Sequence, residues 1–321
     1  MKRLVVPAVA VAVLLIALAW WAVLRTGSLD TVSVAADSTA ESPAKRMNAP
    51  ARSEVIAVPE RPAPARSVLT PASISLRDEI RDAPDLKALY DRMKDVRDPT
   101  GERSYRLAEA IFECSAFIDL PMEQLSAKLA IRKDARDNPR RNQVLATMVK
   151  RCAGFAGMGA RFHEIYQELH ARAEAAGYPA EIARALRAEA SNPDLERADA
   201  TAMKLLASNP EPEVLFEISQ YLGLRNRGVP PGNIDGQTRA IAWGLVECEY
   251  GADCGPQSRS LMMTCILMGA CELTRVEEAV MAQGASQSTI NAAARLRDQL
   301  IQRIANRDWA GLGFVERNKS P

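Results

Sequence analysis

The sequence predicts an all-α fold, an irregular α/α helical array of solenoid-like form, preceded by one N-terminal transmembrane helix. Two observations favour the helical fold. The 321-residue chain is 47% hydrophobic but only 5% aromatic, and Ala, Leu, Arg and Glu are its main residues. Such residues lose little side-chain entropy in a helix. The second observation is that apolar residues beyond residue 73 recur at helical spacing, with Asn-Pro or Gly steps between the runs.

The N-terminus predicts a membrane anchor. A short basic start precedes an apolar run from Leu4 to Leu24, which is about 31 Å long as a helix and matches one hydrocarbon core. A cleavable signal peptide usually has a shorter apolar region with a small-x-small site close behind it. The nearest such site, Val34-Ala35-Ala36, lies well beyond the run. We therefore expect residues 1–24 to be a single-pass signal anchor in a bacterial inner membrane; a cleaved signal peptide is the alternative.

The rest of the chain is expected in the periplasm, because the basic start should stay cytoplasmic. Residues 25–72 predict a disordered tether, since they are rich in Ala, Pro and Ser and repeated prolines prevent regular backbone hydrogen bonding. An α-helical domain is expected over residues 73–309 and a flexible tail over residues 310–321. The net charge of +1 gives no argument for nucleic-acid binding, which usually needs a basic domain.

Apolar periodicity and helix-stop signals predict the order of the helices. Asp85 is expected to cap the first, and Gly177 to end the fifth in the left-handed conformation. The segment from Arg225 to Gly236 is expected to be a connection, with a binding loop as the alternative. The predicted helices run near Leu86–Val96, Ser104–Ile118, Met122–Ala135, the segment after Pro139 that ends near Cys152, Arg161–Ala176, Ala180–Ala190, the segment between Pro193 and Ser208, the segment around Val214–Leu222, Gln237–Glu249, Ser258–Met268, Thr274–Gln283 and Ser288–Trp309.

One part of this series resembles bacterial Sel1-like and tetratricopeptide helical-repeat proteins. The run Ala173-Glu174-Ala175-Ala176-Gly177, followed by Ala180 and Leu186, is similar to the small-residue and Gly turn of a Sel1-like unit, and Leu222-Gly223 is a second similarity. The resemblance covers roughly residues 160–225. No period of about 34 to 40 residues repeats along the chain, so the prediction remains an irregular array.

Two of the six cysteines, Cys114 and Cys152, fall on the apolar stripes of neighbouring helices. In an oxidising compartment, paired thiols are expected. A Cys114–Cys152 bridge would close a loop of about 38 residues and stabilise the fold by roughly 3 to 4 kcal/mol. Two buried free thiols are the alternative.

The other four cysteines form two C-x5-C units, each with a Gly-Ala step inside: Cys248 with Cys254, and Cys265 with Cys271. A bridge between Cys254 and Cys271 would span a whole helix, about 25 Å, and a bridge from Cys254 to Cys265 would reach over two turns. We therefore predict the two local pairs, which clamp helix ends. A zinc site or a redox-active pair fits less well, because zinc knuckles and thioredoxin-type motifs use shorter spacings.

No catalytic, cofactor-binding or metal-binding residues are predicted. The chain has no P-loop, G-x-S-x-G or G-x-G-x-x-G motif. Its two histidines, His163 and His170, lie about 10 Å apart along one predicted helix, too far for one metal, and are expected at the surface or its boundary. Glu211, Glu213 and Glu217 are expected on a solvated helix face.

These features predict a membrane-anchored extracytoplasmic helical protein that acts as a protein-binding or scaffold module, with another envelope protein as partner. The alternative is an envelope enzyme, for instance a glycan-cleaving one, that uses a glutamate in a helical cleft. A deep pocket with two convergent carboxylates and a raised pKa would favour the enzyme. A purely structural spacer, the third hypothesis, would have no groove.

Overall fold

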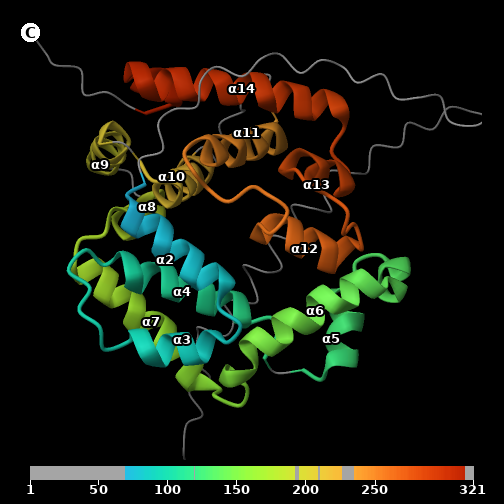
Figure 1. The fold of residues 1–321 in the computed structure, drawn as a ribbon. Helices are drawn as coiled ribbons and strands as arrows, with labels where there is room; N and C mark the ends of the chain where they lie inside the picture. Colours follow the sequence, from blue (N-terminus) through green and yellow to red (C-terminus); the bar gives the residue numbers. More distant parts are fainter. Residues whose placement is uncertain (1–68, 119, 192–194, 209, 226–234, 315–321) are drawn as a thin grey trace, which may run out of the picture. The chain divides into compact units, whose positions relative to one another are not determined.

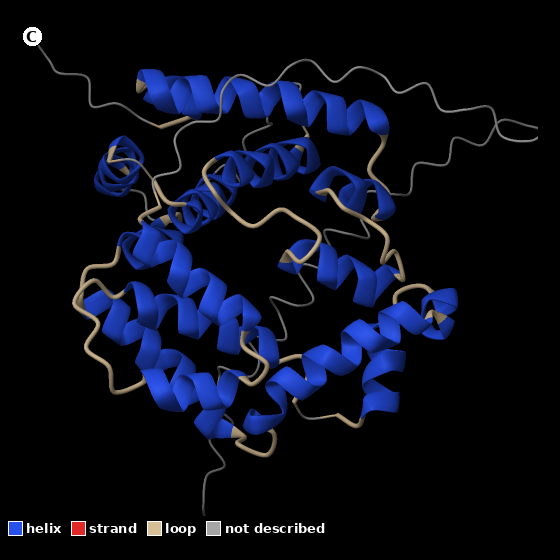
Figure 2. Cartoon of the chain, viewed as in Figure 1, coloured by secondary structure: helices blue, strands red, loops and turns tan. Residues whose placement is uncertain are grey.

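The computed structural model describes residues 69–118, 120–191, 195–208, 210–225 and 235–314 (Figure 1). Every regular element in these ranges is helical, with fourteen α-helices, two short 3-10 helices and no strand (Figure 2). The all-α prediction is therefore confirmed for this part of the chain. The predicted anchor, residues 1–24, lies outside it. Within the described ranges, no helix combines the length and apolarity that crossing a bilayer requires.

The helices follow the predicted order closely. Their bounds are α2 Pro71–Asp82, α3 Leu86–Met93, α4 Glu102–Cys114, α5 Met122–Leu129, α6 Pro139–Cys152, α7 Ala160–Ala175, α8 Pro179–Glu189, α9 Glu196–Ala207, α10 Pro212–Arg225, α11 Gly236–Glu249, α12 Arg259–Met268, α13 Val276–Ala282, α14 Gln287–Asn306 and α15 Trp309–Leu312. The 3-10 helices η1 (Lys133–Asp137) and η2 (Ala153–Phe155) follow α5 and α6.

Helix α2 lies where the apolar pattern predicts no helix. The hydroxyl of Thr70 caps it by accepting a hydrogen bond from the backbone N–H of Ser73 at 3.1 Å. Pro71 occupies the first turn, where its missing N–H leaves no bond unmade. The predicted tether of residues 25–72 is therefore wrong at its end, since α2 begins at Pro71. Most of the tether, and the loop of residues 226–234, lie outside the described residues.

The C-terminal boundary also differs from the prediction. Helix α15 and the residues after it pack on the fold, with Leu312 and Phe314 buried in the core. The predicted tail of residues 310–321 is therefore wrong for residues 310–314. Residues 315–321 lie outside the described ranges.

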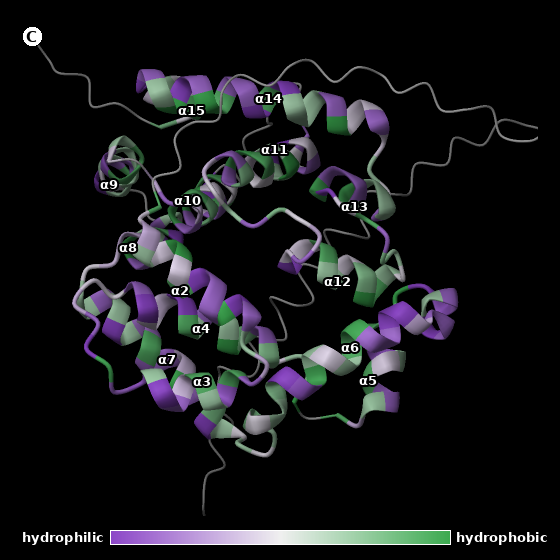
Figure 3. Cartoon of the chain, in the orientation of Figure 1, coloured by the Kyte–Doolittle hydropathy of each residue, from purple (hydrophilic) through white to green (hydrophobic). Residues whose placement is uncertain are grey.

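Amphipathic helices build two apolar clusters. One lies mainly among α8, α9, α10, α11 and α14, and the other mainly among α3, α4, α6 and α7, with Ile266 of α12. Helix α11 packs against α14, α10 against α8, and α4 against α7. Apolar and polar residues alternate along most helices (Figure 3), as expected where each helix turns one apolar face toward its neighbours.

The three predicted disulfides are all present. Cys114–Cys152 joins α4 to α6 with a Cα–Cα distance of 5.3 Å. Cys248–Cys254 and Cys265–Cys271 each join the last turn of a helix, α11 or α12, to a residue beyond it, with Cα–Cα distances of 5.7 and 4.4 Å. Gly251 and Gly269 reverse the chain after each helix with φ of 100° and 75°, a conformation that glycine adopts without steric cost. The local pairs therefore clamp helix ends, as predicted.

The disulfides should differ in how much they stabilise the fold. Replacing both cysteines of the Cys114–Cys152 pair by alanine opens a loop with a sequence separation of 38 and should lower the free energy of unfolding by about 4 kcal/mol in the chain-entropy model. The same change at Cys248 and Cys254, with a separation of 6, should cost about 2 kcal/mol. Urea unfolding of both double variants measures the difference, and an equal or reversed order would contradict this assignment.

Candidate functional site

A cavity of about 480 Å³ lies between α2, α4, α12 and the loop that joins α11 to α12. This volume falls in the range of roughly 300 to 1,000 Å³ that small-ligand sites occupy. We call it the main cavity. Its charged wall residues are the arginines Arg77, Arg81, Arg106, Arg151 and Arg259 and the acids Asp78, Glu109, Glu113, Glu213 and Asp253.

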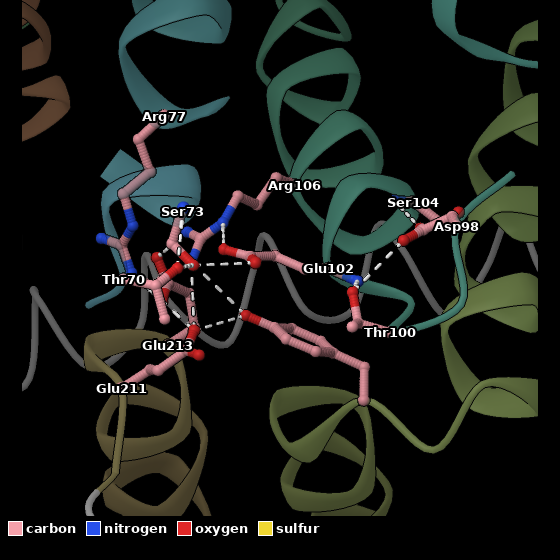
Figure 4. A network of polar contacts seen from close by, with 11 residues as sticks. Thr70, Ser73, Arg77, Asp98, Thr100, Glu102, Ser104, Arg106, Glu211 and Glu213 are labelled. Atoms are coloured by element: carbon pink, nitrogen blue, oxygen red, sulfur yellow. Dashed lines mark hydrogen bonds and ion pairs between the residues drawn. The ribbon is translucent and has the colours of Figure 1, made fainter. Parts of the chain in front are cut away.

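Arg106 on α4 is the centre of a buried ionic network (Figure 4). The side chain is 7% exposed, and its guanidinium contacts the carboxylates of Glu102 at 2.8 Å, Glu211 at 3.1 Å and Glu213 at 2.6 Å. Burial alone would lower the pKa of Arg106, but the carboxylates, Glu213 foremost, raise it. The charge is therefore fully compensated, as a buried guanidinium requires.

The same network attaches α2 to the rest of the fold. Arg77 of α2 contacts Glu213 at 2.6 Å, and the hydroxyl of Ser73 donates to Glu102 at 2.9 Å (Figure 4). Glu213 thus bridges Arg77 and Arg106. Because α2 forms one wall of the main cavity, the network also fixes the shape of that wall.

The prediction that Glu211, Glu213 and Glu217 form a solvated face is wrong. Glu211 and Glu213 belong to the Arg106 network, and Glu217 is only 2% exposed. The hydroxyl of Tyr105 donates to Glu217 at 3.2 Å, and Arg187 lies 3.1 Å from its other oxygen. These carboxylates point inward because α10 packs between α8 and α11.

Two glutamates of this region resist ionisation. Burial raises the pKa of Glu217 to about 7, against the opposing effect of Arg187. Burial, together with the charges of Glu213 and Glu217, raises the pKa of Glu247 to about 8. The interface between α10 and α11 therefore holds carboxyl groups that change charge near neutral pH.

His170 is buried, which corrects the prediction that both histidines lie at the surface or its boundary; His163 is exposed as predicted. The Nδ1 atom of His170 lies 2.6 Å from Glu181, and its Nε2 atom lies 3.5 Å from Glu109. Burial would lower the pKa of His170, but the hydrogen bonds with Glu109 and Glu181 raise it. Glu109, in the wall of the main cavity, therefore has a readily protonated imidazole behind it.

Glu113 lies one helical turn beyond Glu109, so both carboxylates share one face of α4. Its nearest cation is Arg259, at 3.5 Å. Burial raises the pKa of Glu113, while Arg259 and Arg151 act in the opposite direction. The two carboxylates of this cavity wall therefore have different neighbours: Glu109 lies near His170, and Glu113 lies near Arg259.

Arg151 is the one of these arginines that forms no ion pair with a carboxylate of the described residues. It is 8% exposed, and its Nη2 atom donates to the backbone oxygen of Ile80 at 2.6 Å. No carboxylate of the described residues forms an ion pair with it, and its buried Nε–H has no hydrogen-bond acceptor among them. Burial lowers the pKa of Arg151, although Glu113 and Asp82 raise it. Glu113 and Asp82 compensate this buried charge without forming an ion pair with it. Because a buried charge that is only partly compensated is costly, the main cavity offers a place for an anion.

The loop between α11 and α12 closes one side of the main cavity. Gly251, Ala252 and Asp253 line it and lie inside the ring closed by the Cys248–Cys254 disulfide. The backbone N–H groups of Gly251 and Ala252 donate to the last turn of α11 at 3.2 and 3.0 Å. The disulfide therefore fixes a wall of the cavity as well as the end of α11.

The comparisons with known proteins identify no relative: no family model, no curated protein and no solved structure matches the chain. Among the described residues, no group of three or more His, Cys, Asp and Glu side chains is arranged to hold a metal ion. The candidate site therefore depends on its geometry. The predicted disulfide cysteines contribute to it through the loop that Cys248 and Cys254 close and through the Cys114–Cys152 bridge, whose neighbours Glu113 and Arg151 line the cavity.

The raised pKa of Glu247 has a consequence for stability. A carboxyl group whose pKa rises from 4.5 to about 8 on folding binds its proton more tightly in the folded state, so stability falls as pH increases between these values and is then constant. Glu247→Gln removes this loss. The free energy of unfolding of the variant should fall less steeply over that interval, by about 1.4 kcal/mol per pH unit at most.

Urea unfolding at a series of pH values tests this expectation. The matched control is Glu174→Gln, at an exposed position of α7, which should leave the pH profile of the wild type unchanged. An identical profile for Glu247→Gln and the wild type would show that Glu247 ionises without cost in the folded protein.

Proposed function

We propose that the chain is a membrane-anchored, extracytoplasmic binding module that engages another envelope protein through the main cavity. The observation that carries this proposal is Arg151, a buried guanidinium in the cavity wall that forms no ion pair among the described residues and is only partly compensated by Glu113 and Asp82. An acidic group supplied by a partner would compensate that charge. Binding would then recover part of the desolvation cost that the free protein carries.

The rigidity of the walls supports binding over a spacer role. The Arg106 network holds α2, and the Cys248–Cys254 disulfide holds the loop on the other side. A cavity whose walls are fixed before binding loses little conformational entropy when a partner enters. A purely structural spacer has no need for such a cavity.

The arrangement of the helices supports the same proposal. Helices α7, α8, α10, α11 and α14 each pack on the next in this series, as in a solenoid-like α/α array. Sel1-like and tetratricopeptide proteins, which residues 160–225 resemble, use such arrays to present binding surfaces. The proposed anchor and the tether of residues 25–72 would place the module in the periplasm with freedom to reach its partner.

Site-specific photocrosslinking of the full chain in its own membranes tests this function. A benzoylphenylalanine replaces Gln257, an exposed residue of the cavity wall, or Gln302, an exposed residue of α14 that serves as the control. An adduct is expected from position 257 and not from position 302, and Arg151→Met should reduce it at least tenfold. No adduct from position 257, or an adduct that Arg151→Met leaves unchanged, would contradict the proposal.

A specific observation also favours the alternative, an envelope enzyme of the glycan-cleaving type. The main cavity contains two carboxylates on one helix face, and burial raises the pKa of Glu113 while Glu109 lies 3.5 Å from His170. Such a pair can divide the roles of general acid and base. In this candidate mechanism, protonated Glu113 donates to the leaving glycosidic oxygen, and Glu109 takes a proton from the attacking water.

Release of a fluorophore from a chitooligosaccharide or a muropeptide glycoside tests the enzyme. The wild type should hydrolyse at least one of them, and Glu113→Gln should slow it by about 100-fold or more, whereas Glu174→Gln should not. A rate with the wild-type protein no higher than that in buffer would exclude this candidate for these substrates. Hydrolysis that Glu113→Gln leaves intact would exclude Glu113 as the acid.

A further inference from the structure

A second cavity adjoins the main one. It has a volume of about 200 Å³ and lies between α4, α6 and α12. Its wall is largely apolar, with Phe117, Met148, Met263 and Ile266 among its residues. We call it the methionine cavity.

The two cavities share three wall residues, Glu113, Arg259 and Met262. They therefore meet at the Glu113–Arg259 ion pair, whose atoms lie 3.5 Å apart. One side of this boundary is charged, and the other is apolar. A ligand that occupies both cavities must combine a charged group and an apolar group within a short distance.

The sign of the charged group follows from the ion pairs of the main cavity. Arg77, Arg81 and Arg106 each form an ion pair with a carboxylate of the protein. Arg151 forms none in the described part of the chain, and Glu113 and Asp82 compensate its charge only from a longer distance. A carboxylate in the cavity would neutralise the Arg151 guanidinium. A cationic ligand would not compensate the charge of Arg151.

Glu113 does not oppose an incoming carboxylate strongly. Burial raises its pKa, and a second carboxylate nearby favours the protonated form further. Arg259, which is half exposed, can turn toward either group.

The apolar side is suited to side chains of more than one shape. Methionine is flexible and polarisable, so a methionine-lined pocket adapts to different apolar groups. Met148, Met262 and Met263 all contribute to the methionine cavity, and Phe112 at its wall is 46% exposed. This exposed aromatic ring can cover an apolar group that enters the cavity.

We propose that the ligand of this site is the carboxyl-terminal residue of a partner protein, with its free carboxylate on Arg151 and its apolar side chain in the methionine cavity. The proposal rests on the function proposed above and names the chemistry of the segment bound. In a terminal residue, the carboxylate and the side chain branch from one Cα, so a single residue can reach two cavities that share a wall. Capture of a free carboxyl terminus is a known mode of peptide recognition.

Fluorescence anisotropy with the purified full chain in detergent tests the proposal. The probes are a fluorescein-labelled tetrapeptide that ends in a leucine free acid, the same peptide as the amide, and its serine free-acid counterpart. The leucine acid should bind at least tenfold more tightly than the amide, because the amide peptide lacks the charge-assisted hydrogen bond with Arg151. The leucine acid should also bind about tenfold more tightly than the serine acid, because the serine side chain buries less apolar surface in the methionine cavity.

Two variants assign these preferences to the two cavities. Arg151→Met should abolish the preference for the acid over the amide, while Arg151→Lys keeps part of it. Met263→Gln, at a partly exposed position, should abolish the preference for leucine over serine and leave the acid preference intact. The melting temperature of each variant shows that it is folded, so a lost preference reports on the site.

Equal affinity for the acid and the amide, or an acid preference that survives in Arg151→Met, would overturn the inference. Octanoate is a competitor that carries a carboxylate and an apolar chain without a peptide; if it binds more tightly than the leucine peptide, a lipid-derived ligand replaces the carboxyl terminus. Crosslinking from position 257 is independent of these probes. An adduct there together with equal acid and amide binding would leave the binding function in place and reject only the terminal carboxylate.

Discussion

The buried guanidinium of Arg106 is the constraint on which the candidate site depends. A charge at this depth requires carboxylates around it, and it obtains them from α4 itself and from the start of α10. Glu213 also contacts Arg77, which fixes α2 against the same region. Because α2, α4 and Glu213 together form much of the wall of the main cavity, the ionic network that stabilises the fold also shapes the site.

The chemistry of the cavity comes from what this network leaves uncompensated. Arg106 and Arg77 form ion pairs with carboxylates, but Arg151, on α6 beside the Cys114–Cys152 disulfide, forms none among the described residues and is only partly compensated by Glu113 and Asp82. The wall opposite is a loop held by Cys248–Cys254. Two of the three disulfides therefore stabilise parts of the fold that line the cavity. An oxidising compartment, which the proposed periplasmic location would supply, suits such a site.

Periodicity predicted most helices, and reach along a helix predicted the local disulfide pairs. Periodicity could not identify the candidate site. A periodic pattern shows which face of a helix is buried, but not which side chains of distant helices pack against that face. Glu217 illustrates both points. Its position three residues after Val214, on the buried stripe of α10, indicates burial. Its partners Tyr105 and Arg187, however, come from α4 and α8, which the pattern does not show. Helix α2 was missed because it begins with a proline after a proline-rich segment.

The central claim is that Arg151 binds an anion, and nitrogen-15 NMR of arginine Nε–H groups tests it most directly. The Arg151 signal is assigned by its absence in Arg151→Lys. We expect the leucine-acid peptide to shift this signal saturably, because a bound carboxylate changes the electrostatic surroundings of the Arg151 guanidinium, while the Arg106 signal stays in place. An Arg151 signal unchanged at saturating peptide, or shifted equally by the amide, would contradict the account.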